Sequence, residues 1–465
     1  MSDQFDVVVI GGGPAGYASA LYGASAGLKV ALVERDKVGG TCLHRGCIPA
    51  KELLETAHVF RTVADAATFG VNAGAPAIDW SVTMQRKQQV VDTQWKGLEA
   101  TIKGRQIEIV PGTGRLRGPG VVEVEGPDGT TTLGAMSVIL ASGSAPRTIP
   151  GFEVDGKFVL TSDEVLSMPD LPRTAVVIGG GAIGCEFAST LADVGVQVTV
   201  LEGLPKILPG CDADVANVVA RSFKKRGIEV RTGVRITGHE PGETTTKVQI
   251  EGSEPLEVER IIVSVGRRPL SDTLGLDGSG VEVDERGFVK VSDTCRTTLE
   301  GVWAVGDLIA TPQLAHVGFA EAIVTIKDIL GESPIPVAYD RVPWAIYCHP
   351  EVAFAGHSED SAREAGLDVI VSKHSFKSNA RAWILNDTDG LVKVIAEKGA
   401  DGRAGRILGV HMVGPWVTEQ LGQGYLAVNW EATVDEVAAF IQPHPSLSEL
   451  FGETVLSMTG RALHG

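Results

Sequence analysis

The sequence has few cysteines, few aromatic residues and no long apolar run. Its six cysteines are spread over 465 residues, unlike the dense pattern of a small secreted protein held together by disulfides. No apolar stretch reaches the roughly 18 residues that a membrane-spanning helix needs. An apolar segment already begins at Phe5, so a signal or transit peptide has no room before it. We therefore expect a cytoplasmic protein that does not enter a membrane and holds no metal site.

Positive charge is also scarce. The chain has 41 Lys and Arg residues against 58 Asp and Glu residues, and its formal net charge is −17. This balance argues against nucleic acid and anionic membranes as partners. The hydrophobic content of 43% is that of a soluble globular protein, and 465 residues are too many for one core. We expect several domains.

A glycine-rich motif follows the first apolar segment. Phe5–Ile10 is expected to be a strand, and the run after it has Gly11, Gly13 and Gly16 at the G-x-G-x-x-G spacing of a dinucleotide-binding loop. The three glycines permit the tight turn, the approach of a pyrophosphate and close packing of the next helix on the strand. Glu34 ends the next expected strand, where a carboxylate can accept hydrogen bonds from a ribose.

The same arrangement occurs a second time. Gly179, Gly181 and Gly184 follow the expected strand Ala175–Ile178, and Glu202 ends the strand after the helix. Each acidic residue comes 23 positions after the first glycine of its own loop, so the chain has an internal repeat with two dinucleotide sites. A carboxylate at Glu202 favours the free 2′-hydroxyl of NAD over the 2′-phosphate of NADP.

Between these repeats lies the run Gly39–Lys51, which contains Cys42 and Cys47 in a segment otherwise typical of a helix. A regular helix, at about 100° per residue, would place the two side chains roughly 140° apart. A disulfide needs Cβ atoms about 3.8 Å apart, so the helix must be distorted if the two bond, and Gly46 and Pro49 are the expected cause. Lys51, one turn after Cys47, can lower a thiol pKa. Two buried structural cysteines are the alternative.

With the strand–loop–helix units around it, the run GGTCLHRGCIPAK resembles the redox-active disulfide of the flavin-dependent pyridine nucleotide–disulfide oxidoreductases, class I. The resemblance extends from Phe5 to about Glu453. It implies an α/β fold with two Rossmann-like domains, for FAD and NAD, and an α+β C-terminal dimerisation domain. We expect an FAD domain at 1–150, an NAD domain at 151–271, a segment returning to the FAD domain at 272–340 and the dimerisation domain at 341–465.

The resemblance also implies roles for individual residues. Cys42 and Cys47 would form the redox disulfide, and His444 with Glu449 would be the acid–base pair, which reaches the disulfide of the other subunit in a homodimer. Glu186 would pair with Lys51 beside the flavin. The remaining FAD candidates are Gly114, Ser142, Gly143, Ser144, Asp307, Gln313, Leu314, Ala315 and His316, and the remaining NAD candidates are Val234 and Gly266. His316 could instead be an ordinary histidine at a helix start.

Among family members the motifs are most similar to dihydrolipoamide dehydrogenases. The expected activity is oxidation of protein-bound dihydrolipoyl groups with reduction of NAD⁺, and the expected partners are the lipoyl domains of 2-oxoacid dehydrogenase or glycine cleavage complexes. Two alternatives stay open: an NAD(P)H-dependent reductase for another small disulfide, and a redox-sensing flavoprotein. The sequence also predicts an antiparallel excursion at Val121–Leu133 and a separate buried strand at Val138–Ala141.

Overall fold

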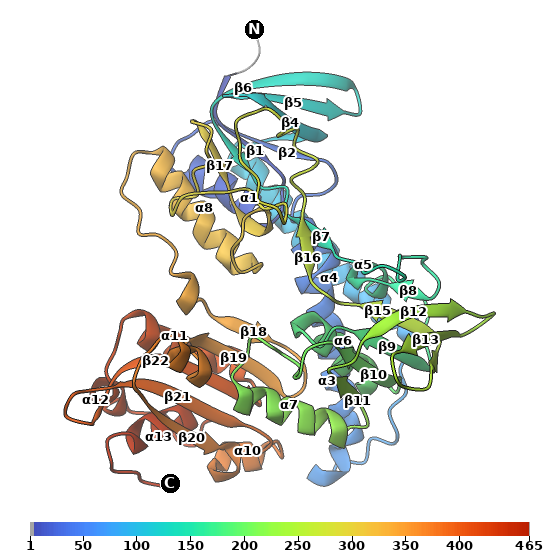
Figure 1. Cartoon of the computed structure of the whole chain (residues 1–465), viewed down its shortest axis with the longest axis vertical. Coiled ribbons are helices and arrows are strands. Elements are labelled where there is room, and N and C mark those ends of the chain that lie inside the picture. Colours follow the sequence, from blue (N-terminus) through green and yellow to red (C-terminus); the bar gives the residue numbers. More distant parts are fainter. Residues whose placement is uncertain (1–3, 465) are drawn as a thin grey trace.

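The computed structural model describes residues 4–464, which form three units (Figure 1). The N-terminal unit, at the top of Figure 1, is built on a sheet in the order β3-β2-β1-β6-β5-β4, with β17 also paired to β6. Its strands are β1 (Gln4–Ile10), β2 (Val30–Glu34), β3 (Glu108–Pro111), β4 (Thr113–Gly118), β5 (Val121–Gly126), β6 (Gly129–Leu140) and β17 (Val302–Ala304).

The helices of this unit are α1 (Pro14–Ser25), α2 (Gly40–Arg45), α3 (Cys47–Ala64), α4 (Trp80–Gly104) and α8 (Ala315–Ile329), with single turns η1 (Ala66–Phe69) and η2 (Gly306–Leu308). Val7, Val8 and Val9 are fully buried in β1, as expected for a parallel strand covered on both faces. Pro14 begins α1, where its missing N–H costs no helical hydrogen bond. Helix α1 packs against α8.

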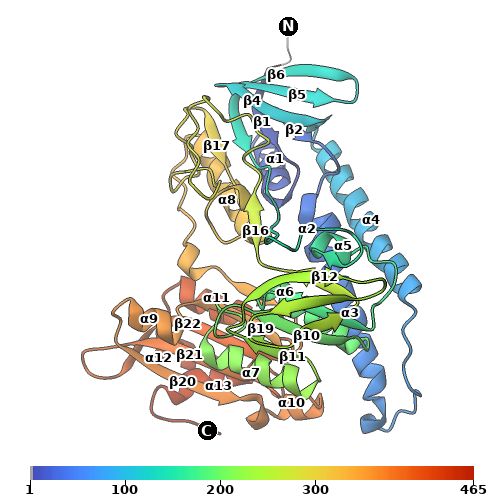
Figure 2. The ribbon, with the colours of Figure 1, turned by 45° about the vertical axis from the view of Figure 1, so that its right-hand side comes forward.

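The second unit repeats this arrangement. Its parallel sheet has the order β11-β10-β9-β15-β8. The elements are β8 (Val159–Leu160), α5 (Ser162–Val165), β9 (Thr174–Ile178), α6 (Ala182–Asp193), β10 (Gln197–Glu202), α7 (Ala213–Lys225), β11 (Glu229–Thr232) and β15 (Arg260–Val263). A three-stranded antiparallel sheet of β12 (Ile236–Pro241), β13 (Thr246–Ile250) and β14 (Leu256–Val258) lies on the outer side of this unit (Figure 2). The pair β7 (Ser144–Pro146) and β16 (Arg267–Pro269) connects it to the first unit.

The C-terminal unit is an antiparallel sheet in the order β18-β19-β22-β21-β20, at the lower left of Figure 1. The strands are β18 (Trp344–Ile346), β19 (Glu351–Gly356), β20 (Val369–Ser375), β21 (Leu391–Lys398) and β22 (Ala404–Gly414). Helices α9 (Glu359–Glu364), α10 (Ala380–Ile384), α11 (Val417–Asn429), α12 (Val434–Ala438) and α13 (Glu449–Ser457) and turns η3 (Tyr339–Arg341) and η4 (Phe376–Ser378) complete it.

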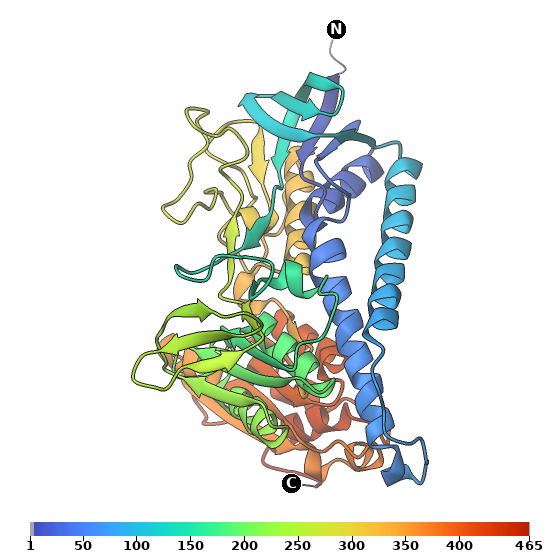
Figure 3. The same cartoon turned by 90° about the vertical axis from the view of Figure 1, so that its right-hand side faces the viewer.

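Helix α3 connects the units. It lies beside α4 in Figure 3 and runs from the middle of the molecule toward its lower end. Leu53 and Ala57 of α3 are buried in the same apolar core as Phe187 of α6 and Ile346 of β18. This packing fixes the start of α3 relative to both the second and the C-terminal unit. None of the helices in the described part of the chain combines the length and hydropathy that crossing a membrane requires.

Candidate active site

A cavity of about 480 Å³ lies where the first two units meet. Its wall includes Gly11–Ala15 after β1, residues from both α2 and α3, and Ala182, Ile183, Glu186 and Phe187 at the start of α6. Both Cys42 and Cys47 line it. The cavity therefore brings the cysteine run together with the first glycine-rich loop and with the helix that follows the second.

The two glycine-rich loops have matching geometry. A Cβ atom at Gly16 would lie 1.8 Å from the carbonyl oxygen of Gly11, and one at Gly184 would lie 1.9 Å from that of Gly179. Gly11 and Gly179 have φ values of +108° and +105°, which only glycine adopts without strain. At Gly13 and Gly181, by contrast, an added Cβ would meet nothing within 4 Å. The loops are thus closed toward the protein and open where a nucleotide phosphate would approach.

Each acidic residue at the end of the second strand of a repeat binds its own glycine loop. Gly12 donates its N–H to Glu34 Oε2 at 2.6 Å, and Gly180 donates to Glu202 Oε2 at 2.6 Å. The second oxygen of Glu202 accepts the N–H of Leu204 at 2.7 Å. Glu34 also lines the cavity. These carboxylates position the loops in addition to the ribose contact that the sequence suggests.

Cys42 and Cys47 are free thiols in this structure, which is the reduced form of the expected redox pair. The helix is interrupted between them at Gly46, with φ −149° and ψ −113°, where α2 ends and α3 begins. Pro49 does not cause the break, because it lies in the first turn of α3, where a backbone N–H has no helical partner. The pKa of Cys47 is lowered to about 7, chiefly by a hydrogen bond from the Cys42 thiol and also by the Lys51 ammonium, while the pKa of Cys42 is raised.

Lys51 is held by a bidentate ion pair. Its Nζ lies 2.9 Å from both carboxylate oxygens of Glu186, which is the expected pairing. Tyr347 donates its N–H to Glu186 Oε1 at 2.9 Å, and its ring lies 4.9 Å from Lys51 Nζ. Burial lowers the pKa of Lys51, but the Glu186 carboxylate more than offsets this, and the pKa is raised. A fixed positive charge therefore faces Cys47.

A second set of polar side chains, Ser144, Arg267 and Asp307, also lines the cavity. Ser144 hydrogen-bonds Asp307, and Arg267 donates from Nε to Ser144 Oγ at 2.6 Å and from Nη2 to Ser144 O at 2.8 Å. Ser142 Oγ donates to Leu270 O at 3.0 Å. Sequence reasoning gave Arg267 no role, although a cation directly after a buried strand was a usable signal.

Glu321 supports the loop that carries Asp307. Its buried carboxylate accepts the Gly306 N–H at 2.7 Å, the Thr311 hydroxyl at 2.7 Å and the Tyr339 hydroxyl at 3.2 Å. Burial raises the pKa of Glu321 to about 7. The sequence gave no sign of this residue beyond its place on a helix.

The structure places the other candidates in two groups. Gly114, Gly143, Gln313, Leu314 and Ala315 line the cavity. His316 does not: it is exposed, and its Nε2 lies 2.8 Å from Pro343 O, so its flavin contact stays a prediction. Val234 and Gly266 also lie outside the cavity wall, and Val234 donates its N–H to the carbonyl oxygen of Glu202 at 3.2 Å.

His444 and Glu449 form a hydrogen-bonded pair at the start of α13. Nδ1 of His444 lies 2.8 Å from Glu449 Oε1, and Ser446 donates its N–H to Glu449 Oε2 at 2.6 Å. The His444 side chain is 73% exposed and does not line the cavity that contains the cysteines of the same chain. The base is therefore oriented but faces solvent in a single chain.

Residues 5–322 match the pyridine nucleotide-disulphide oxidoreductase family model, and residues 342–455 match the dimerisation domain of that family. The chain belongs to this family. A dihydrolipoyl dehydrogenase of Bacillus subtilis (strain 168) is 40% identical over 478 residues, covering 100% of both chains. A second, of Chlorobaculum tepidum, is 38% identical and covers 97% of both.

Solved structures of the family superpose on the whole chain. LpdA from Mycobacterium tuberculosis has a TM-score of 0.91 at 25% identity, covering 98% of this chain and 99% of the other. The Cu(II) complex of the HOCl-induced flavoprotein disulfide reductase RclA from Escherichia coli has a TM-score of 0.87 at 26% identity, with the same coverage. Members of this oxidoreductase family use FAD and NAD.

The residues of the cavity fit FAD. The Gly13 position is open to a pyrophosphate, and Gln313 offers a buried Nε2 with no hydrogen-bond partner among the described residues. Asp307 and Ser144 line the same cavity and would offer polar groups to the hydroxyl-rich part of the cofactor. Ile183 and Phe187 at the start of α6 line the same wall, so the second unit also borders the cavity.

Proposed function

We propose that the protein is an FAD-dependent dihydrolipoyl dehydrogenase, which oxidises dihydrolipoyl groups and reduces NAD⁺. The observation that supports this best is the adjacent thiol pair of Cys42 and Cys47, with the Lys51–Glu186 ion pair beside it, in the wall of a cavity that both dinucleotide-binding units line. The full-length similarity to dihydrolipoyl dehydrogenases points the same way.

The thiol chemistry begins with Cys42 and Cys47 joined in a disulfide. A thiolate of the dihydrolipoyl group attacks Cys42, the bond between the two protein sulfurs breaks, and Cys47 leaves as a thiolate. The second substrate thiolate then attacks the substrate sulfur that is bonded to Cys42. The lipoyl disulfide closes, and Cys42 leaves as a thiolate that takes up the proton held by His444. His444, oriented by Glu449, accepts the proton of the attacking substrate thiol.

FAD, when bound, supplies the redox centre through which the two electrons of the dithiol reach NAD⁺. The protein's contribution is to hold both nucleotides and tune the sulfurs. Gly11, Gly13 and Gly16 form the loop for one pyrophosphate, and Gly179, Gly181 and Gly184 form the loop for the other. Lys51 keeps a positive charge beside the Cys47 thiolate.

The partners follow from this activity. The family dimerisation domain is present, and we propose a homodimer in which His444 serves the cysteines of the other subunit. The exposure of His444 and its absence from the cavity wall of its own chain support this arrangement. Lipoyl domains of 2-oxoacid dehydrogenase or glycine cleavage complexes are the proposed substrates, and a cytoplasmic location stays a prediction.

The test is a side-by-side rate measurement with dihydrolipoamide and NAD⁺, with glutathione disulfide and NADPH, and with a free quinone and NADH. We expect the first pair to be turned over far faster than the others. An NAD-linked reductase for another small disulfide is the second candidate, because RclA, a flavoprotein disulfide reductase, superposes on the whole chain. Faster reduction of a small disulfide than oxidation of dihydrolipoamide would favour that candidate.

A further inference from the structure

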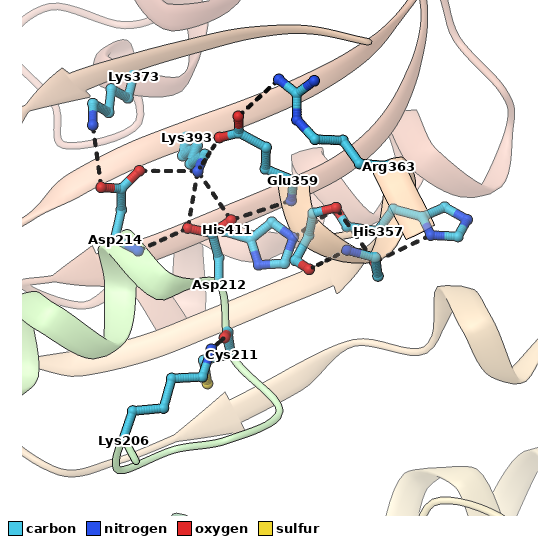
Figure 4. A network of polar contacts seen from close by, with 12 residues as sticks. Lys206, Cys211, Asp212, Asp214, His357, Glu359, Arg363, Lys373, Lys393 and His411 are labelled. Carbon is cyan, nitrogen blue, oxygen red and sulfur yellow. Dashed lines mark hydrogen bonds and ion pairs between the residues drawn. The ribbon is translucent and has the colours of Figure 1, made fainter. Parts of the chain in front are cut away.

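A buried lysine far from the thiols binds three carboxylates. The side chain of Lys393, in β21, is only 3% exposed. Its Nζ lies 3.0 Å from Asp212, 2.9 Å from Asp214 and 2.8 Å from Glu359 (Figure 4). Burial lowers the pKa of Lys393, but the hydrogen bonds from its ammonium to these carboxylates raise it by more. The ammonium is therefore charged, and removing it would leave the buried carboxylate of Asp212 without a counter-ion.

This cluster joins two units of the molecule. Asp212 and Asp214 stand at the start of α7 in the second unit, whereas Lys393 and Glu359 belong to the C-terminal unit. Two further cations complete it, since Lys373 pairs with Asp214 at 3.1 Å and Arg363 pairs with Glu359 at 3.0 Å. Three positive and three negative side chains thus balance across the contact.

The cluster also lies at the end of the segment that supports the second glycine loop. Residues 203–212 lead from Glu202 at the end of β10 to Asp212. Leu208 in this segment donates its N–H to the Gly180 carbonyl at 2.7 Å. Ile207 packs so closely on Gly180 that an added Cβ there would lie 2.7 Å from its Cγ2.

The far end of the segment is held by Asp212. Its Oδ1 accepts the Asp214 N–H at 2.9 Å and so caps α7, and the same carboxylate binds Lys393. Between the two ends, Cys211 donates its N–H to Leu208 O at 2.9 Å, and Lys206 Nζ lies 3.2 Å from Cys211 O. One continuous set of contacts therefore runs from the Gly180 loop to Lys393.

We propose that Lys393 is a positioning residue for NAD⁺: from the C-terminal unit it holds Asp212, and through residues 203–212 it fixes the nucleotide loop of the second unit. This inference rests on the proposed NAD⁺ site at that loop. The proposal separates the two half-reactions, because the thiol pair lies on α2 and α3, whereas the cluster is built from α7, α9 and β21 and from Asp212 before α7. Loss of Lys393 should therefore weaken NAD⁺ binding and leave the reaction with the dithiol intact.

The experiment compares Lys393→Met with Lys398→Met in the FAD-loaded protein. Lys398 ends the same strand but forms an exposed pair with Asp368 at 3.5 Å, so it is a matched control. We expect Lys393→Met to raise the Kd for NAD⁺, measured by calorimetry, between about twofold and thirtyfold. The rate of reduction by dihydrolipoamide in stopped flow should stay unchanged, and Lys398→Met should change neither quantity.

A second pair of variants covers the case in which Lys393→Met does not fold. Asp212→Asn keeps an N-cap acceptor for α7, and Lys393→Met with Asp212→Asn removes one charge of each sign. If Lys393 acts through Asp212, the double variant should bind NAD⁺ within about twofold of Asp212→Asn alone. A further loss of NAD⁺ affinity well beyond twofold, relative to Asp212→Asn alone, would overturn the proposal.

Hydrogen exchange of residues 203–212 gives a readout that does not depend on NAD⁺. Exchange there should become faster in Lys393→Met than in wild type or Lys398→Met. Unchanged exchange together with unchanged NAD⁺ affinity would overturn the positioning role. If wild type does not bind NAD⁺ at all, the proposed activity fails, and the exchange result alone decides whether Lys393 fixes the loop.

Discussion

At the scale of single residues, Cys47 is the sulfur best prepared to carry negative charge. Its pKa is lowered to about 7, chiefly by the hydrogen bond from Cys42. We predict that two-electron reduction produces a broad long-wavelength absorbance band from the Cys47 thiolate beside the oxidised flavin. Acid protonates a thiolate, so the band should be lost as the pH falls through about 7 and present above it.

Cys42→Ser should show this band without any reductant, because Cys47 is then free and the serine hydroxyl that replaces the thiol can still donate a hydrogen bond. Cys47→Ser is the matched control and should show no band. A band in Cys47→Ser and none in Cys42→Ser, with flavin retained in both, would mean that the roles of the two sulfurs are reversed.

A second prediction at this scale concerns Glu202. We predict that its carboxylate makes the protein prefer NAD⁺ over NADP⁺. A carboxylate repels the 2′-phosphate, but it also accepts the N–H groups of Gly180 and Leu204. Glu202→Gln keeps a hydrogen-bond acceptor and removes the charge, so it should reduce the NAD⁺/NADP⁺ ratio of kcat/KM by about tenfold, or 1.4 kcal/mol. Equal kcat/KM values for the two nucleotides in wild type would contradict the role of Glu202.

At the scale of elements, the glycine loops allow a matched comparison. Gly16→Ala places a Cβ where the Gly11 carbonyl already lies, so we expect it to destabilise the protein by about 1–3 kcal/mol even without flavin. Gly13→Ala meets open space, so the flavin-free protein should keep its melting temperature and bind FAD more weakly. Calorimetry of the flavin-free variants and FAD titration measure both effects. Equal melting temperatures would show that the loop tolerates a side chain at Gly16.

The repeated strand–loop–helix–strand units could be predicted because the apolar runs and glycine spacing are local signals. The expected separate strand Val138–Ala141 is instead the end of β6, which starts at Gly129, pairs antiparallel with β5 and then parallel with β1. Its change of partner depends on the tertiary arrangement and is not encoded in a short pattern. The contacts of Arg267, Tyr347 and Lys393 were missed for the same reason, since their partners lie more than 100 residues away.

At the scale of the whole molecule, the decisive question is where His444 acts. It is 73% exposed and lies apart from the cavity wall of its own chain, so we predict two composite sites per dimer. Cys47→Ser and His444→Ala chains should each be inactive. When mixed and allowed to exchange subunits, each heterodimer has one site with both changes and one with neither, so activity should return to about half of wild type per heterodimer. No returned activity after exchange confirmed by mass would place the complete site within one chain.

The break at Gly46 has one more consequence, which concerns helix polarity. In a continuous helix both sulfurs would lie in the helix interior, where the partial charges of successive peptide dipoles cancel. Because α3 begins anew at Cys47, this sulfur alone stands at the positive end of an 18-residue helix. An anion there gains about 0.3–1 kcal/mol, and the gain is present whichever cation or substrate is nearby. The start of α3 thus adds to the hydrogen bond from Cys42 and to the Lys51 ammonium in favouring negative charge on Cys47 when the pair opens.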